Sequence, residues 1–156
     1  MTQPVSPSIV QGFYLAYVSR DAERMASFLD DDVEWLVTGP VDLLEYCGYR
    51  RGKDAVVDLY GRILPKLFEF RGFDPRDFLI DGDRAAVFGR ISAVQRSTGR
   101  LISYMCAHFV RFQNDRVVSF ASLTDSFDAA EQVLGHPIAQ SSRDRTAFSE
   151  FGVVAV

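Results

Sequence analysis

The sequence predicts an α+β domain in which helices pack on one side of a bent antiparallel sheet. Residues 78–124 contain three long strand-like segments joined by tight turns, and residues 7–68 carry apolar side chains at helical spacing. A short helix predicted between Asp125 and Gly135 completes the order of elements. A curved sheet covered by helices leaves a cone-shaped cavity on its concave face, so we expect a small-molecule pocket there.

The first two predicted helices begin with capping signals. Ser6 and Pro7 form an N-cap followed by a first-turn proline, and apolar residues recur at helical spacing as far as Ser19. Asp21 is a candidate cap for a second, short helix over Ala22–Leu29. Both helices are expected to turn their apolar faces toward the sheet.

The middle of the chain alternates between extended, irregular and helical segments. Val33–Val37 is predicted to be a short strand. Val41–Arg51 reads as a loop, although it carries more apolar side chains than a solvated loop requires. A third helix is predicted over Lys53–Phe68, with a kink at Pro65.

The second half of the chain supplies most of the predicted sheet. A strand near Phe78–Ile80 precedes a long strand over Arg84–Arg96. Tyr104–Phe112 and Arg116–Thr124 flank the two-residue turn Asn114–Asp115, which is typical of a hairpin.

Composition indicates one domain and argues against several function classes. The 156 residues are 47% apolar, enough for one core. The net charge of −4 comes without a block of Lys or Arg, which argues against a nucleic-acid partner, and no apolar run approaches the roughly 20 residues of a membrane span. Cys47 and Cys106 lack metal-ligand spacing, and no secretory signal is visible, so we expect a cytoplasmic protein without metal or cofactor.

Two segments carry a resemblance to a known family. The sequence FLDDDVEW at Phe28–Trp35, the ending TDSF at Thr124–Phe127 and the order of elements resemble the NTF2-like superfamily, more narrowly its SnoaL-like branch of polyketide cyclases and ketosteroid-isomerase-related proteins. The resemblance covers roughly residues 8–136. It implies a cone-shaped α+β barrel, usually dimeric through the outer face of its sheet, with the pocket opening among the helices.

The resemblance and the composition together define the expected domain organisation. Residues 1–136 are expected to form the SnoaL-like domain, with three helices in its N-terminal half and one at its end. Residues 137–156 begin polar and end apolar, so this tail is expected to dock on the same domain or on a dimer partner.

The catalytic groups of ketosteroid isomerases are not matched. At the positions similar to the isomerase tyrosine, base and neutral acid, this chain has Phe13, Val37 and Ala107, with Tyr14 beside the first of them. Because valine cannot take a proton, a true ketosteroid isomerase is not expected.

The resemblance to the cyclase branch implies a different pair of catalytic residues, an aspartate and a histidine. In polyketide cyclases a late-strand aspartate works as acid/base near a strand histidine, and this chain offers Asp125 and His108. An ungapped count places Ser122 at the position of that aspartate. Either a β-bulge brings Asp125 into place or the cyclase pattern is absent.

The hairpin turn predicts which side chains share a face. With a two-residue turn, His108 lies opposite Ala121 and Tyr104 lies opposite Asp125. One face then carries His108, Cys106, Tyr104, Leu123 and Asp125, and the other carries Met105, Phe109, Phe120 and Thr124.

These placements predict an acid/base site. A carboxylate in an apolar cavity has a raised pKa, which suits proton transfer at an activated C–H bond. Asp125 is the expected acid/base, His108 its partner, and Tyr14 a donor to an enolate oxygen. Structural alternatives stay open: an N-cap role for Asp125, a core or interface position for His108, and helix packing for Tyr14.

Further residues are candidates for substrate binding. Trp35, Tyr46 and Tyr49 suit an aromatic wall, although a lone Trp is also typical of a core. Arg90 suits a carboxylate ligand or a partner such as Glu34, with a surface position at a strand edge as the alternative. The predicted substrate-binding set also includes Tyr17, Tyr104 and Cys106.

Two functional hypotheses of different class follow. The first is a cofactor-independent cyclase or isomerase that moves a proton on an apolar cyclic substrate, and it predicts Asp125 and His108 in one cavity. The second is a non-catalytic protein that binds a hydrophobic small molecule, and it predicts an aromatic cavity with no titratable group at its base. Both predict a homodimer with a small-molecule ligand.

Overall fold

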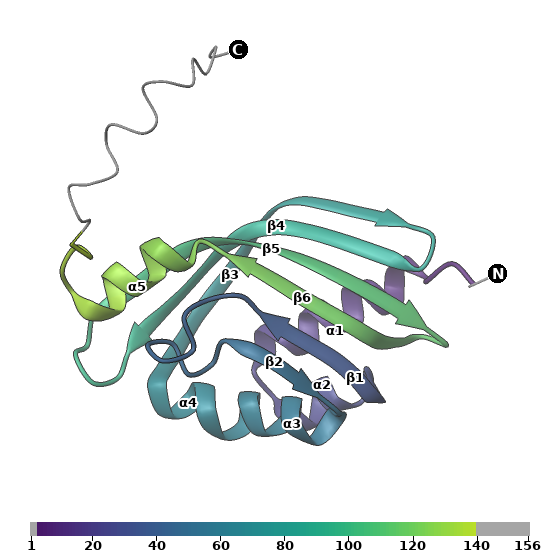
Figure 1. Ribbon diagram of the computed structural model, residues 1–156. Helices are drawn as coiled ribbons and strands as arrows, with labels where there is room; N and C mark the ends of the chain where they lie inside the picture. The colour runs from purple at the N-terminus through teal and green to yellow at the C-terminus, as the bar shows by residue number, and fades with distance from the viewer. Residues whose placement is uncertain (1–2, 140–156) are drawn as a thin grey trace, which may run out of the picture.

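The computed structural model describes residues 3–139 and shows a curved sheet whose concave side is covered by helices (Figure 1). The strands are β1 (Leu29–Val37), β2 (Gly48–Arg51), β3 (Phe68–Asp81), β4 (Arg84–Gln95), β5 (Leu101–Gln113) and β6 (Arg116–Thr124). The helices are α1 (Pro7–Ser19), α2 (Ala22–Ala26), α3 (Lys53–Asp58), the π-helical turn η1 (Leu59–Ile63), α4 (Leu64–Leu67) and α5 (Ser126–Leu134). The predicted docking of the tail falls largely on residues 140–156, which lie outside the described residues.

The six strands follow the order β2-β1-β6-β5-β4-β3. All neighbours pair antiparallel except β1 and β6, which pair parallel. The sheet is therefore mixed, and it does not close, because β2 and β3 remain at its edges. This arrangement confirms the predicted α+β class and its curved sheet.

The helix boundaries follow the capping signals. The side chain of Ser6 accepts a hydrogen bond from the Ser8 amide at the start of α1, and Asp21 accepts one from the Arg24 amide at the start of α2. The second helix ends earlier than predicted because β1 already begins at Leu29.

Three elements differ from the sequence prediction. The segment read as a loop ends in strand β2, which pairs with β1. The single helix predicted around Pro65 is divided into α3, η1 and α4, and the proline lies in the first turn of α4. Strand β3 begins ten residues before Phe78, because Gly72 and Pro75 adjoin register shifts within one strand. A bulge absorbs these residues, which a sequence reading takes as strand breakers.

The predicted register of the last hairpin is wrong by one residue. A bulge between Arg111 and Phe112 shifts the pairing, so that His108 lies opposite Ser122 and not opposite Ala121. Every later residue of β6 therefore changes face. Leu123 is exposed on the outer face. The concave side receives Phe120, Ser122 and Thr124, which line a hollow there together with Cys106.

Aromatic side chains fill much of the concave side. The ring of Phe13 on α1 lies within 6.5 Å, centroid to centroid, of Trp35, Phe112 and Phe120. Trp35 stacks on Phe120 at 3.8 Å and is fully buried. These rings anchor the first helix to β1, β5 and β6.

The absence of a side chain at Gly89 in β4 allows Phe73 and Asp74 of β3 to lie close to it. A Cβ atom at Gly89 would lie 2.5 Å from the carbonyl oxygen of Asp74 and 3.0 Å from the ring of Phe73. The missing side chain thus leaves room for the Phe73 ring on the concave side.

Among the described helices, none is long and apolar enough to cross a membrane.

Candidate functional site

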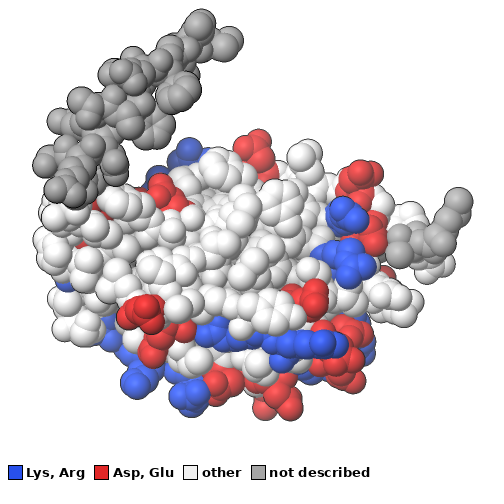
Figure 2. Space-filling view, in the orientation of Figure 1, with Lys and Arg blue, Asp and Glu red and all other residues white. Residues whose placement is uncertain are grey.

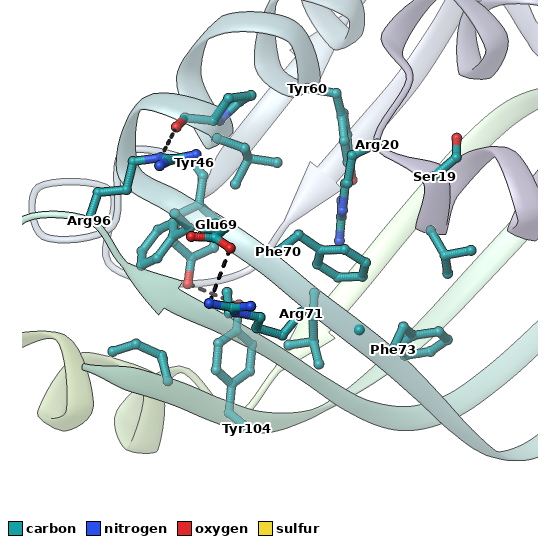
Figure 3. A pocket seen from close by; sticks show the side chains of 18 residues that line it. Ser19, Arg20, Tyr46, Tyr60, Glu69, Phe70, Arg71, Phe73, Arg96 and Tyr104 are labelled. Carbon is teal, nitrogen blue, oxygen red and sulfur yellow. Dashed lines mark hydrogen bonds and ion pairs between the residues drawn. The ribbon is translucent and has the colours of Figure 1, made fainter. Parts of the chain in front are cut away.

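A cavity of about 640 Å³ opens on the concave side of the sheet, and we call it the cone cavity (Figure 3). Its walls come from the end of α1, from η1 and α4, and from the first residues of β3 facing β4 and β5. Apolar side chains such as Leu64, Phe68, Ile91 and Ile102 cover most of the surface. The volume is in the range of typical ligand sites, which are also mostly apolar.

A smaller hollow of about 50 Å³, the inner chamber, adjoins the cone cavity. The two share Arg20, Tyr46, Tyr60 and Tyr104 in their walls. The inner chamber continues toward Cys106 and the side chains of β6. One guanidinium and three phenols thus lie in both walls, together with the shared apolar residues Leu64 and Ile91.

Two phenols form a hydrogen-bonded pair in these walls. The Tyr46 and Tyr104 hydroxyl oxygens lie 3.1 Å apart, and either can donate to the other. Burial raises the pKa of Tyr46 above its ordinary value and raises that of Tyr104 well above it. Both phenols stay protonated at neutral pH, so the pair can offer a hydrogen bond to an oxygen in the cavity.

Arg20 brings a positive charge to the walls. Its guanidinium lies over three aromatic rings, 3.7 Å from the Phe70 centroid, 4.5 Å from that of Tyr17 and 5.2 Å from that of Tyr60. Figure 3 shows the side chain beside Tyr60, with its tip toward Phe70. Its Nε is buried without a hydrogen-bond partner. Within residues 3–139, no carboxylate lies within 4.0 Å of its nitrogen atoms.

Three other charged side chains line the cone cavity, and each has a partner. Glu69 and Arg71 form an ion pair with 3.1 Å between oxygen and nitrogen. Arg96 donates from Nε to the carbonyl oxygen of Pro65 at 2.6 Å. The walls thus hold three arginines and one glutamate, an excess of positive charge in a chain of net charge −4.

The structure brings His108 and Tyr14 together, as the sequence suggested, but in the aromatic core. The Tyr14 hydroxyl lies 3.4 Å from His108 Nδ1, and the two rings are stacked. The imidazole also lies against Tyr17, Phe73 and Phe120, and it is 1% exposed. Neither residue lines the cone cavity or the inner chamber.

Cys106 connects this histidine to the inner chamber. Its Sγ lies 3.5 Å from His108 Nε2. Burial, assisted by the positive charge of Arg20, lowers the pKa of His108 to about 3, and burial raises the pKa of the Cys106 thiol to about 11. Both groups are neutral at pH 7, so they do not form a thiolate–imidazolium pair of the kind that activates a cysteine nucleophile.

The structure places Asp125 away from the predicted acid/base site. The residue is exposed, and its carboxylate accepts a hydrogen bond from the Asp128 amide as the N-cap of α5. It lines neither hollow. The residue opposite His108 is Ser122, the position that the ungapped count had matched to the cyclase aspartate.

The predicted substrate-binding residues separate into two groups. Tyr17 and Cys106 line the inner chamber, and Tyr46 and Tyr104 line both hollows. The other three lie elsewhere. Trp35 is core, Tyr49 is 58% exposed and donates to Glu34, and Arg90 contacts Ser103 at 3.4 Å on the opposite side of the sheet.

The sequence analysis missed Arg20, Tyr60 and Phe70. Arg20 stands between two predicted helices, where a basic residue is ordinarily solvated. Tyr60 lies in a π-helical turn, and Phe70 lies in the part of β3 that was read as non-strand. Nothing in the sequence marked the left-handed position of Arg20 after α1, because such positions usually hold glycine or asparagine.

The described residues contain no group of three His, Cys, Asp or Glu side chains that could hold a metal ion. Apart from Glu69, the charged side chains of the cavity walls are hydrogen-bond donors. Arg20 donates only, and the phenols of Tyr46 and Tyr104 are protonated donors. Such a set is suited to an oxygen that carries negative charge.

Comparison with known proteins identifies relatives at the level of family and fold. Residues 10–120 match the family model described as a SnoaL-like domain. No curated protein matches this chain significantly.

Similar solved structures come from several bacteria. A structure named "Putative Isomerase from Rhodopseudomonas palustris" is 30% identical, with a TM-score of 0.72, and the match covers 82% of this chain and 94% of that one. An NTF2-like protein of unknown function from Burkholderia pseudomallei is 26% identical, with a TM-score of 0.72 and coverages of 81% and 95%. TerC, co-crystallised with polyporic acid, is 20% identical, with a TM-score of 0.71 and coverages of 81% and 96%, and shares the fold.

Proposed function

The chain belongs to the SnoaL-like domain family, and we propose that it binds an apolar, ring-shaped small molecule in the cone cavity. The observation that carries this proposal is the cavity itself, about 640 Å³ with mostly apolar walls. Phe68, Phe70 and Ile91 line this cavity. A flat ring in the cavity would gain dispersion and aromatic contacts with their side chains. The Tyr46–Tyr104 pair and Arg20 would orient such a molecule through its oxygen atoms.

The similar structures support a small ligand in this fold. TerC was crystallised with polyporic acid, and a ketosteroid isomerase-like protein from Catenulispora acidiphila was crystallised with trimethylamine. Those ligands belong to those proteins. For this chain they support only that the fold can hold a small molecule, while the wall residues decide which molecule fits.

A blocking variant tests the proposal. Ala93 lines the cone cavity, so Ala93→Trp places an indole in the ligand space. Titration with the neutral bicyclic ketone 2-tetralone, followed by calorimetry, is expected to show saturable binding to the wild type and none to this variant. Leu101→Trp is the matched control, because Leu101 is 65% exposed and lies outside the cavity. Equal binding to all three proteins would contradict the proposal.

A second candidate function is proton transfer of the isomerase or cyclase type. It is favoured by the donors Arg20, Tyr46 and Tyr104, which suit an enolate oxygen. Among the described residues, Glu69 is the one carboxylate that lines the cone cavity, so it replaces Asp125 as the candidate base. Its carboxylate lies 3.1 Å from the guanidinium of Arg71.

Hydrogen–deuterium exchange separates this candidate from simple binding. An enzyme of this type would accelerate exchange of the α-protons of 2-tetralone in D₂O, followed by NMR, and Glu69→Gln would reduce the rate without reducing affinity. Exchange at the background rate in the presence of saturating wild-type protein would remove the enzymatic candidate and leave the binding function.

A homodimer through the outer face of the sheet is part of the proposal. Figure 2 shows a broad face with few charged residues, whose acidic and basic side chains gather mainly at its margin. Phe88 and Leu123 lie in one row across β4, β5 and β6, with Phe109 in the next row, and all three are exposed. Light scattering is expected to give twice the monomer mass for the wild type and the monomer mass for Phe109→Glu.

A further inference from the structure

We infer that the ligand of the cone cavity is an anion, a cyclic carboxylate whose charged group pairs with Arg20. The inference rests on the proposed binding function and names the class of molecule that the same cavity selects. It starts from the position of a single guanidinium that the rest of the described chain does not neutralise.

The first observation is the environment of this guanidinium. Aromatic faces at 3.7, 4.5 and 5.2 Å hold it in place but carry no net charge. Arg20 is a partly buried residue, and a buried N–H without an acceptor is costly. Arg20 Nε is such a donor, and no other described side chain accepts from it.

The second observation is that nearby acids are committed elsewhere. Asp21 follows Arg20 in the sequence but is exposed, and its carboxylate accepts from the Arg24 amide as the cap of α2. Glu69 is paired with Arg71. The anion that completes the site therefore has to come from outside the described chain.

The third observation is the backbone at this position. Arg20 is the C-cap of α1 in the left-handed region, with φ 57° and ψ 17°. Glycine adopts this conformation without strain, whereas a side chain there costs on the order of 1 kcal/mol. The strained backbone turns the side chain over the aromatic rings and into the walls of both hollows.

The chemistry of the free group selects a carboxylate. The guanidinium carbon of Arg20 lies over the rings of Phe70 and Tyr17, and the N–H donors lie in the plane of the guanidinium. A planar carboxylate matches those donors with two parallel hydrogen bonds. The single positive charge of Arg20 balances one carboxylate. The apolar walls of the cone cavity accommodate the rings to which this carboxylate is attached.

The test compares two probes of nearly equal shape. The acid 2-naphthoate and the neutral amide 2-naphthamide are titrated by calorimetry at pH 7.5. The wild type is expected to bind the acid at least about 10-fold more tightly, because a charged hydrogen bond contributes about 1.5–3 kcal/mol. Arg20→Met is expected to remove this preference and to leave the affinity for the amide nearly unchanged, and Arg20→Lys to retain part of it.

Arg96→Met is the matched control, because Arg96 lines the same cavity and already donates to the backbone of Pro65. This variant is expected to keep the preference for the acid. Equal affinity of the wild type for both probes would overturn the inference and leave the proposed binding function in place. Failure of the folded wild type to bind either probe would overturn both, and neither of these outcomes depends on the folding of a variant.

Discussion

The concave side of the sheet has two halves, one packed and one hollow. In the packed half, α1 covers the sheet, and rings such as Phe13, Trp35 and Phe120 fill the space. In the hollow half, the cone cavity lies between η1 and α4 on one side and the paired strands β3, β4 and β5 on the other. Both halves are rich in aromatic residues, so aromatic content alone does not show where a ligand binds.

Phe73 marks the boundary between the two halves. Its ring stacks on His108 at 5.0 Å and also lines the cone cavity. The residues that looked catalytic in the sequence, His108 and Tyr14, lie on the packed side of this ring. The residues that reach the ligand space, Arg20 and Tyr104, lie on the other side. A buried polar residue therefore belongs to the aromatic core on one side of Phe73 and to the wall of the cone cavity on the other.

The largest difference between the halves is expected for truncated rings. Phe120→Ala should lower the free energy of unfolding by about 3–5 kcal/mol, because it leaves a void against Trp35. Phe70→Ala should lower it by about 1 kcal/mol or less, because one side of that ring already faces the cavity. Chemical denaturation measures both, and equal losses would contradict the division into packed and hollow halves.

A substitution at Gly89 tests the position of Phe73, the ring between the packed and hollow halves. A methyl group there meets the backbone of Asp74 and the ring of Phe73, so Gly89→Ala should cost about 1–3 kcal/mol in unfolding free energy. Gly72→Ala is the control, since a Cβ at Gly72 has no neighbour within 4 Å. If both variants unfold at the same denaturant concentration, the close approach of β3 to β4 is not required.

The packed half also predicts a pH effect. Burial holds the pKa of His108 at about 3, below the ordinary 6.5. Between these values the unfolded chain binds a proton that the folded chain does not. The unfolding free energy should therefore fall as the pH falls below 6.5, by about 1.4 kcal/mol per unit well inside this window.

Two variants isolate this effect by denaturation at pH 7 and pH 5. His108→Leu should reduce the loss of stability between these pH values. His136→Gln, at the exposed second histidine of the chain, should leave the loss as it is in the wild type. An unchanged pH dependence in His108→Leu would show that the imidazole is not held neutral by burial.

The smallest effect is expected for the phenol pair. Tyr46→Phe removes its hydrogen bond with Tyr104 and should cost about 0.5–1.5 kcal/mol in unfolding free energy. Tyr49→Phe removes an exposed hydrogen bond to Glu34 and should cost almost nothing. A cost for Tyr46→Phe as small as that of the control would mean that the pair is solvated and not part of a buried site.

Local signals in the sequence predicted where several elements begin and end. The cap at Ser6, the Asn114–Asp115 turn and the glycine at position 135 each determine an element boundary through nearby residues alone. Such signals predicted α1, the last hairpin and α5. They also predicted Asp125 as an N-cap, the alternative that the structure shows.

The hollow half depends on tertiary features that a single sequence does not show. One bulge beside Arg111 changes the face of every later residue in β6, and two register shifts keep β3 continuous through Gly72 and Pro75. The place of Arg20 depends on three rings from distant segments. The fold class could thus be predicted, but the position of Arg20 in the wall of the cone cavity could not.

The most direct test of the account is a crystal structure of the protein grown with 2-naphthoate. The account predicts density for the two rings between Phe70, Ile91 and Tyr104, with the carboxylate within hydrogen-bond distance of the Arg20 guanidinium. Rings bound on the outer face of the sheet, or a cone cavity filled by the side chains of the protein itself, would contradict it.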